Sequence, residues 1–222
     1  DCAWITGDEL KHLSKVLRMK PGDALEIFDG QGRGFQGELA SVTDRMAEVH
    51  GLSPIDQVRE SPLKVCLVQG IPKGEKMEWV AQKATELGVH RIIPLECCRS
   101  VVKLTLDKKR KERQERWQKV AAEASRQCGR FTIPVVESPM PPKDFFALLK
   151  PNDLFLVPWE EGGLALRSVL GQYKAQNALH DTTQKISAAK TQQGKVGSAA
   201  GSTDLPGYLY VMIGPEGGLT VE

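Results

Sequence analysis

Apolar runs alternate with segments of helical periodicity along the chain after about residue 62. The apolar runs cover residues 64–71, 91–95, 154–157 and 208–213, with a short extended segment at 133–136. Apolar positions recur at helical spacing in residues 74–87, 107–127, 143–149 and 164–170. Strands that are apolar throughout are typical of parallel sheets, whose two faces are both covered. The alternation therefore predicts an α/β fold with a parallel sheet and helices on both of its faces.

The first sixty residues follow another pattern, in which short strand-like runs are separated by turn residues. These runs cover residues 24–28, 35–42 and 46–52. They predict a small β domain over residues 1–60, folded as a compact barrel. A polar segment with a proline, near residues 58–62, marks the boundary, so the second domain covers residues 61–222.

A short helix is expected before these strands, where Thr6 and Glu9 have the spacing of a capping box. One face of this helix is apolar and carries Leu10, Leu13, Val16 and Leu17. The other face is basic and carries Lys11, His12, Lys15 and Arg18. A basic face of this kind can bind RNA phosphates or can be an ordinary solvated surface, and the pattern alone leaves both readings open.

The last apolar run ends abruptly in the glycine-rich turn GPEGG at residues 214–218. Glycines at a strand end let a ligand lie directly against the backbone, and ligands of open α/β sheets bind beyond the carboxyl ends of the strands. The turn lacks the spacing of a phosphate-binding loop, and Glu216 would repel a phosphate. The alternative is a tight turn without a ligand. Residues 172–204 are polar and low in large apolar side chains, which predicts a flexible insertion.

Composition excludes several classes of protein. The net charge is only +2, so a nucleic-acid footprint would have to be local, and basic residues are concentrated between 103 and 130. The five cysteines show no C-x-x-C spacing, which indicates reduced thiols in a cytoplasmic protein. The histidines and cysteines show no zinc spacing, so no metal is expected. No apolar run is long enough to cross a bilayer, so no membrane partner is expected.

Five stretches of the chain, in their order and spacing, closely resemble the RsmE family. They read GDELKHLSKVLRMKPGDALEIFDGQG, GEKMEWVAQKATELGVHRIIPL, RSVVK, WQKVAAEASRQCGR and VMIGPEGGLTVE. RsmE proteins belong to the knotted SPOUT superfamily and methylate a uridine ring nitrogen, giving 3-methyluridine, in 16S ribosomal RNA of the small subunit. The resemblance implies an N-terminal PUA-like β-barrel that binds RNA and a C-terminal SPOUT domain with a trefoil knot. Family members continue past residue 222 with a knot segment of the form LG-x-RILR-x-ET, which this sequence does not contain.

The resemblance also assigns roles to residues. S-adenosylmethionine (SAM) would be the methyl donor, bound in the knot at a homodimer interface. Its pocket would be formed by Val157, Pro158, Trp159, Ile213, Gly214, Pro215, Gly217 and Gly218. Glu216 and Arg99 are the candidate catalytic residues, and for Glu216 shaping the turn is an equal alternative. Contacts with ribosomal RNA are expected from Lys11, His12, Lys15, Arg18, Lys83, Lys103, Arg126 and Arg130.

The leading hypothesis is therefore a SAM-dependent methyltransferase that acts on ribosomal RNA of the small subunit. A second hypothesis is a non-catalytic RNA-binding protein that keeps the barrel but has a degenerate SPOUT domain. A third is a metabolite-binding α/β enzyme unrelated to RNA, whose behaviour with ribosomal RNA would not depend on salt.

Overall fold

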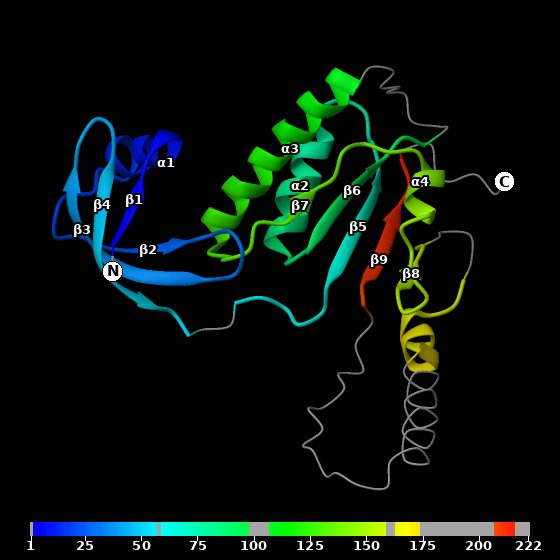
Figure 1. Cartoon of the computed structure of the whole chain (residues 1–222). Coiled ribbons are helices and arrows are strands. Elements are labelled where there is room, and N and C mark those ends of the chain that lie inside the picture. Colours follow the sequence, from blue (N-terminus) through cyan, green and yellow to red (C-terminus); the bar gives the residue numbers. More distant parts are fainter. Residues whose placement is uncertain (1, 57–58, 98–106, 159–162, 174–206, 216–222) are drawn as a thin grey trace, which may run out of the picture.

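The computed structural model describes residues 2–56, 59–97, 107–158, 163–173 and 207–215, and these form two lobes joined by a linker (Figure 1). The N-terminal lobe contains an antiparallel sheet of four strands in the order β1-β4-β3-β2. The C-terminal lobe contains a parallel sheet of five strands in the order β7-β6-β5-β9-β8. The parallel sheet confirms the predicted α/β fold.

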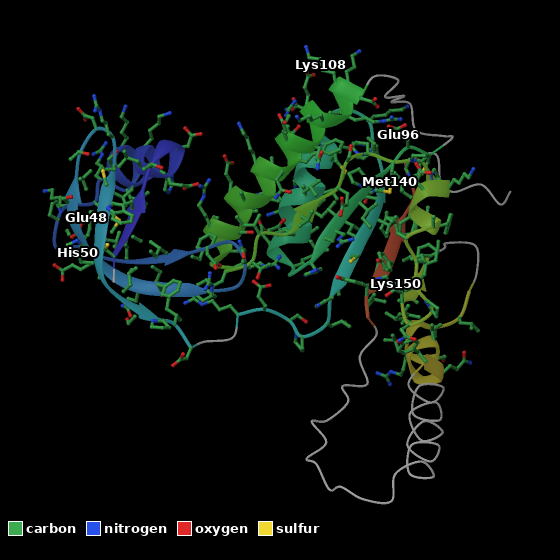
Figure 2. The ribbon with its side chains drawn as sticks, viewed as in Figure 1. Glu48, His50, Glu96, Lys108, Met140 and Lys150 are labelled. Atoms are coloured by element: carbon green, nitrogen blue, oxygen red, sulfur yellow. The ribbon has the colours of Figure 1, made fainter. Side chains whose placement is uncertain are left out.

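The N-terminal sheet is built from β1 (Cys2–Ile5), β2 (Ala24–Phe28), β3 (Gly34–Val42) and β4 (Ala47–Pro54). Three of these strands lie where the hydrophobic pattern predicts them, and β1 was not predicted. The core of the lobe consists of Leu10, Leu13, Leu39, Ala47 and Val49. The imidazole of His50 lies 3.0 Å from the carboxylate of Glu48 on β4, on the side of this lobe that faces away from the parallel sheet (Figure 2).

The short helical segment of this lobe differs from the prediction in two ways. It consists of α1 (Gly7–Lys11) followed by the π-helical η1 (His12–Val16), and Thr6 makes no side-chain capping bond, so the capping box was wrong. Val16 and Leu17 were expected in the core but are 66% and 57% exposed. The i to i+5 bonding of a π-helix changes the residue period, which turns these two side chains away from the core.

The C-terminal sheet agrees with the sequence pattern to within about two residues. Its strands are β5 (Val65–Gly70), β6 (Arg91–Leu95), β7 (Val135–Val136), β8 (Leu154–Leu156) and β9 (Leu209–Ile213). Its helices are α2 (Lys76–Glu86), α3 (Asp107–Cys128) and α4 (Pro142–Phe146), and residues 166–173 are also helical. Gly88 and Gly129 follow α2 and α3 with φ angles of 91° and 74°, and this left-handed backbone ends each helix at its predicted place.

Helices cover both faces of the parallel sheet. On one face, Met77 of α2 and Trp117 of α3 pack with Ile92 of β6 in one apolar core. On the other face, Phe145 of α4 packs with Val68 of β5 and with Tyr210 and Met212 of β9 in a second core. Of the helices in the described part of the chain, none is long and apolar enough to span a membrane.

Strand β9 is buried on one face only. Tyr210 and Met212 are 3% and 6% exposed, whereas Ile213, on the opposite face, is 39% exposed. The prediction that both faces of this strand are covered was therefore wrong among the described residues.

His90 makes the stability of the C-terminal lobe depend on pH. Its ring lies 5.7 Å from the ring of Tyr208, and burial lowers the pKa of His90 below its usual 6.5, with further lowering by Lys64, Arg91 and Arg130 and an opposing effect of Glu60. Well above pH 6.5 the imidazole is neutral in the folded and the unfolded chain, so it contributes no pH dependence there. As the pH decreases through 6.5, the unfolded chain binds the proton more readily than the folded chain does. The free energy of unfolding therefore decreases as the pH decreases, and it levels off below the pKa of the folded state.

We expect urea unfolding at pH values from 7.5 to 5.5 to show this loss of stability, and His90→Gln to flatten it, because glutamine does not titrate. A His90→Gln variant whose free energy of unfolding falls as steeply as that of the wild type would contradict the assignment.

Candidate functional site

The carboxyl ends of β5, β8 and β9 meet at one edge of the parallel sheet. Gln69 of β5 pairs with Ile213 of β9, and Leu156 of β8 pairs with Val211 of β9. The residues that follow these strands therefore lie together, as is usual for ligand sites of parallel sheets. They include two segments predicted from the sequence, Val157 with Pro158 and Gly214 with Pro215.

The Gly214–Pro215 turn is seated directly on the backbone of β5. A Cβ atom on Gly70 would lie 2.6 Å from Cδ of Pro215 and 3.1 Å from the carbonyl carbon of Gly214, so only glycine permits this contact. The side-chain amide of Gln69 donates hydrogen bonds to the carbonyl oxygens of Gly70 at 2.9 Å and Gly214 at 3.5 Å. Gln69 thus fastens the turn to the end of β5.

A cleft of about 360 Å³ opens beside this turn, between the end of β9 and the first half of α2. Its walls are mainly apolar, and they are formed by Gln69, Pro72, Lys76, Trp79, Val80, Ile213, Gly214 and Pro215. The indole of Trp79 is 64% exposed, so it presents a flat surface for stacking. Such a cleft suits a planar, weakly charged ring better than a phosphate group.

The structure brings together some of the predicted cofactor residues. Ile213, Gly214 and Pro215 line the cleft. Val157 and Pro158 lie at the same edge of the sheet, after β8, but are not part of the cleft wall. Trp159, Glu216, Gly217 and Gly218 lie outside the described residues, as do Arg99 and Lys103.

Sequence reasoning missed the contribution of β5 and α2 to this cleft. Gln69 gave a signal, because it is the polar residue within the otherwise apolar run of β5 and it precedes a glycine. Trp79 gave another, since it breaks the polar face of an otherwise regular amphipathic helix.

The core at the amino ends of β5 and β9, away from the cleft, is chemically inert. Burial raises the pKa of the Cys66 thiol to about 11 and that of the Tyr210 phenol to about 12, so both stay protonated at neutral pH. Among the described residues, no cluster of histidine, cysteine and carboxylate side chains could hold a metal ion. Cys66 and Tyr210 therefore supply no proton acceptor. The described residues that line the cleft can bind and orient a ligand.

The predicted RNA-binding residues of the first lobe are on its surface. Lys11, His12, Lys15 and Arg18 are all exposed on or after α1 and η1, and Lys11 forms an ion pair with Asp8 at 2.9 Å. In α2, Lys83 forms an ion pair with Glu86 at 2.8 Å. Exposed pairs of this kind are weak, so these lysines remain available to phosphate.

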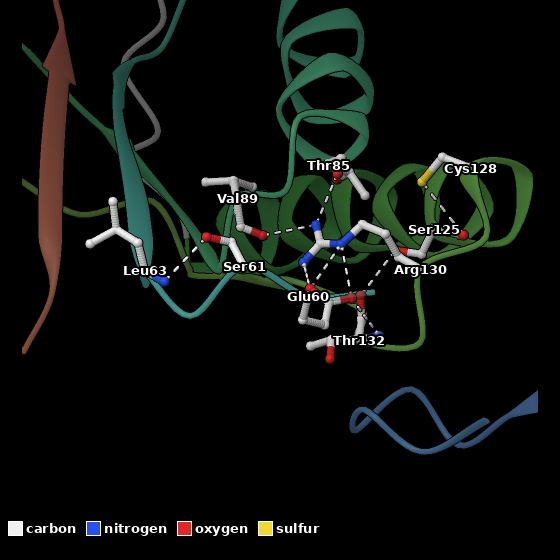
Figure 3. Close-up of polar contacts among 9 residues, drawn as sticks. All are labelled: Glu60, Ser61, Leu63, Thr85, Val89, Ser125, Cys128, Arg130 and Thr132. Carbon is white, nitrogen blue, oxygen red and sulfur yellow. Dashed lines mark hydrogen bonds and ion pairs between the residues drawn. The ribbon is translucent and has the colours of Figure 1, made fainter. Parts of the chain in front are cut away.

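Arg126 and Arg130 instead make contacts within the protein. Arg126 pairs with Glu9 of the N-terminal lobe. Arg130 is 6% exposed, and it donates to the carboxylate of Glu60 at 2.7 Å and to the carbonyl oxygens of Thr85 and Val89, both at 2.9 Å (Figure 3). The expected contact of Arg130 with RNA is therefore corrected to a structural role, because its donors are directed at buried protein acceptors.

Comparison with known proteins gives consistent matches along the whole chain. An RNA methyltransferase domain matches residues 59–222, and an RNA methyltransferase PUA domain matches residues 5–49. The ribosomal RNA small subunit methyltransferase E of Bacillus subtilis is 35% identical over 97% of this chain and 74% of its own length. That of Synechocystis is 26% identical over 97% of this chain and 60% of its own length.

Solved structures of similar fold give the same family. A ribosomal RNA small subunit methyltransferase E from Neisseria gonorrhoeae, bound to SAM, has a TM-score of 0.75 and 25% identity, covering 100% of this chain and 77% of the other. A methyltransferase from Legionella pneumophila, also with bound SAM, has a TM-score of 0.74 and 28% identity, with the same coverage. The parallel sheet, the matched domains and these relatives together show that the chain belongs to the RsmE family of ribosomal RNA small subunit methyltransferases.

Proposed function

We propose that this protein transfers a methyl group from SAM to a uridine in ribosomal RNA of the small subunit, and that the acceptor is the ring nitrogen N3. The observation that carries the proposal is the Gly214–Pro215 turn, which is seated on Gly70 and open to an apolar cleft at the carboxyl edge of the parallel sheet. The turn belongs to the stretch VMIGPEGGLTVE, which resembles the family motif, and two relatives with the same fold contain bound SAM.

The described residues fit SAM, which carries an adenine ring and no phosphate. The backbone of Gly214 and Pro215 and the side chain of Ile213 supply a close, mainly apolar wall for a flat ring. Val157 and Pro158 follow β8 at the same edge of the sheet. We assign Trp159, Gly217 and Gly218, which lie outside the described residues, to the same pocket. Bound SAM supplies an electrophilic methyl group on a sulfonium centre.

The acceptor nitrogen must lose its proton before or during transfer. We propose that the carboxylate of Glu216 accepts this proton. Arg99 holds the uracil ring or the phosphate of the same nucleotide. The N3 lone pair then bonds to the methyl carbon as the electrons of the carbon–sulfur bond return to sulfur. Orientation of the two reactants contributes about 7 to 11 kcal/mol in well-ordered systems, and a general base adds about 10²- to 10⁴-fold. Positioning is thus the larger contribution.

The RNA partner is held by the basic side chains outside the cleft. We assign this role to Lys11, His12, Lys15 and Arg18 on the PUA domain, and to Lys83 and Lys103 on the methyltransferase domain. Arg126 joins them by exchanging its pair with Glu9 for a phosphate. The exposed fraction of the four N-terminal side chains supports the assignment. We further propose that the N-terminal sheet closes into a barrel and that the C-terminal domain contains a trefoil knot. The protein would act as a homodimer in the cytoplasm.

The proposal is tested by calorimetric titration of the full-length protein with SAM and by mass mapping of ribosomal RNA from cells that lack it. We expect one SAM per chain and the loss of one methylated uridine from small-subunit RNA, restored by the intact gene. A full-length protein that binds ribosomal RNA but not SAM, and restores no methyl group, would instead support a non-catalytic RNA-binding protein.

A further inference from the structure

The two lobes meet along a continuous seam at the edge of the sheet opposite the cleft. The turn between β2 and β3 pairs with the segment that follows α3: the amide of Gly32 donates to the carbonyl of Phe131 at 3.1 Å, and that of Ile133 donates to the carbonyl of Gly30 at 3.0 Å. Gly30 also forms a β-bridge with Thr132. The C-terminal lobe thus extends the N-terminal hairpin with its own backbone.

Phe131 fills the centre of this seam. Its ring is 4% exposed and is stacked on Phe28 of β2 with 6.4 Å between the centroids. The guanidinium of Arg59, in the linker, lies 4.4 Å from the centre of the same ring. A Cβ atom on Gly34 would lie 2.4 Å from the ring, so this position of the ring requires glycine at the start of β3.

Charged side chains close the seam on the linker side. Glu60 accepts bonds from Arg130 at 2.7 Å and from the amide of Thr132 at 3.2 Å, and Arg130 also binds the end of α2 (Figure 3). Arg59 bridges Glu26 of β2 at 3.0 Å and the carbonyl of Gly129 at 3.2 Å. Each linker arginine or glutamate therefore bonds to residues that are distant in the sequence.

A buried ion pair is a poor source of net stability, because the cost of removing two charges from water offsets their attraction. The directed hydrogen bonds of such a pair, however, can form in few arrangements of the surrounding residues. Arg130 has donors directed at Glu60 and at the carbonyl oxygens of Thr85 and Val89, so a shift of the linker would leave a buried charge without a partner. These bonds hold the linker in one position on the C-terminal lobe, and the contacts of Phe131 with Phe28 and Gly34 join the N-terminal lobe to it.

We propose that Glu60, Arg130 and Phe131 form an interdomain latch that fixes the PUA domain relative to the methyltransferase domain, and so sets the position of the bound RNA relative to the cleft. These are positioning residues for the RNA substrate, and the inference rests on the proposed function. The latch touches the C-terminal end of α2, whereas Lys76 and Trp79 at its other half line the cleft. The 11-residue helix is about 16 Å long, which separates the latch from the cofactor.

The test uses full-length Arg130→Met and Gly34→Ala variants, which disturb the latch from opposite lobes. In both we expect faster hydrogen exchange at the amides of Gly32 and Ile133, with the amides of β9 still protected. We expect the KM for small ribosomal subunits to rise by about tenfold or more, while the Kd for SAM stays within about twofold.

Arg110→Met is the matched control. Arg110 also makes a two-bond pair with a glutamate, Glu96, at 2.8 and 2.9 Å, but both residues belong to the C-terminal lobe. This variant should leave exchange at Gly32 and Ile133 unchanged.

Two results would overturn the latch. In one, both variants keep the seam amides protected and the KM for RNA unchanged. In the other, the Kd for SAM rises by the same factor as the KM for small ribosomal subunits, which would mean that these residues support only the methyltransferase domain. If wild-type protein methylates no small-subunit RNA, the proposed function fails, whereas hydrogen exchange at the seam still decides whether the latch exists.

Discussion

Gly70→Ala will lower the affinity for SAM by about 5- to 150-fold, the range that corresponds to about 1 to 3 kcal/mol of overpacking. The new methyl group would lie 2.6 Å from Cδ of Pro215 and 2.7 Å from its nitrogen. The crowded atoms include backbone, which cannot rotate away as a flexible side-chain end can. The turn must therefore move, and it is the turn that walls the cleft. Calorimetric titration of the full-length variant with SAM measures the effect.

Gly171→Ala is the matched control for this substitution. Gly171 lies in the described helical segment before residue 174, its backbone is not in the left-handed region, and a Cβ there meets no atom within 4 Å. We expect wild-type SAM affinity from it. A Gly70→Ala protein that is folded, by its circular dichroism, and binds SAM as the wild type does would disprove the role of the seated turn.

The sequence was most informative where apolar periodicity decides the structure. The run RIIPL predicts β6 to the residue, and Gly88 and Gly129 end α2 and α3 where the pattern places them. Such signals are local, since a buried strand needs apolar residues and a helix end needs a left-handed backbone. Strand β1 carries no such signal: Cys2–Ile5 is apolar but short, only its alternate residues are partly buried, and its pairing with β4 is non-local.

The candidate site could be predicted only in part. The glycine turn at Gly214 was visible because a strand ends in glycine and proline. The contact of this turn with Gly70 could not be predicted, because Gly70 and Pro215 are 145 positions apart in the sequence. The parallel pairing of β5 and β9 brings them together. Arg130 was likewise predicted to contact RNA from its position in the family motif, and only the fold shows its pair with Glu60, which is distant in the sequence.

The core under α4 connects stability to the site. Phe145 is fully buried, and its ring lies 5.6 Å from Phe155 of β8 and 5.6 Å from Tyr210 of β9, the two strands that lead into the cofactor edge. The adjacent Phe146 belongs to the same helix but is 49% exposed. The two phenylalanines therefore form an internal comparison of buried and surface packing.

Phe145→Ala will lower the free energy of unfolding by about 3 to 5 kcal/mol, because it removes a ring from a closely packed core and leaves a cavity. Phe146→Ala should cost less than about 1.5 kcal/mol, since half of that ring already faces solvent. Urea unfolding, followed by circular dichroism, measures both. Saturating SAM binds only the folded chain, so it should raise the urea midpoint of both variants, and more weakly for Phe145→Ala if β8 and β9 have shifted. Equal losses in the two variants would show that α4 does not anchor these strands.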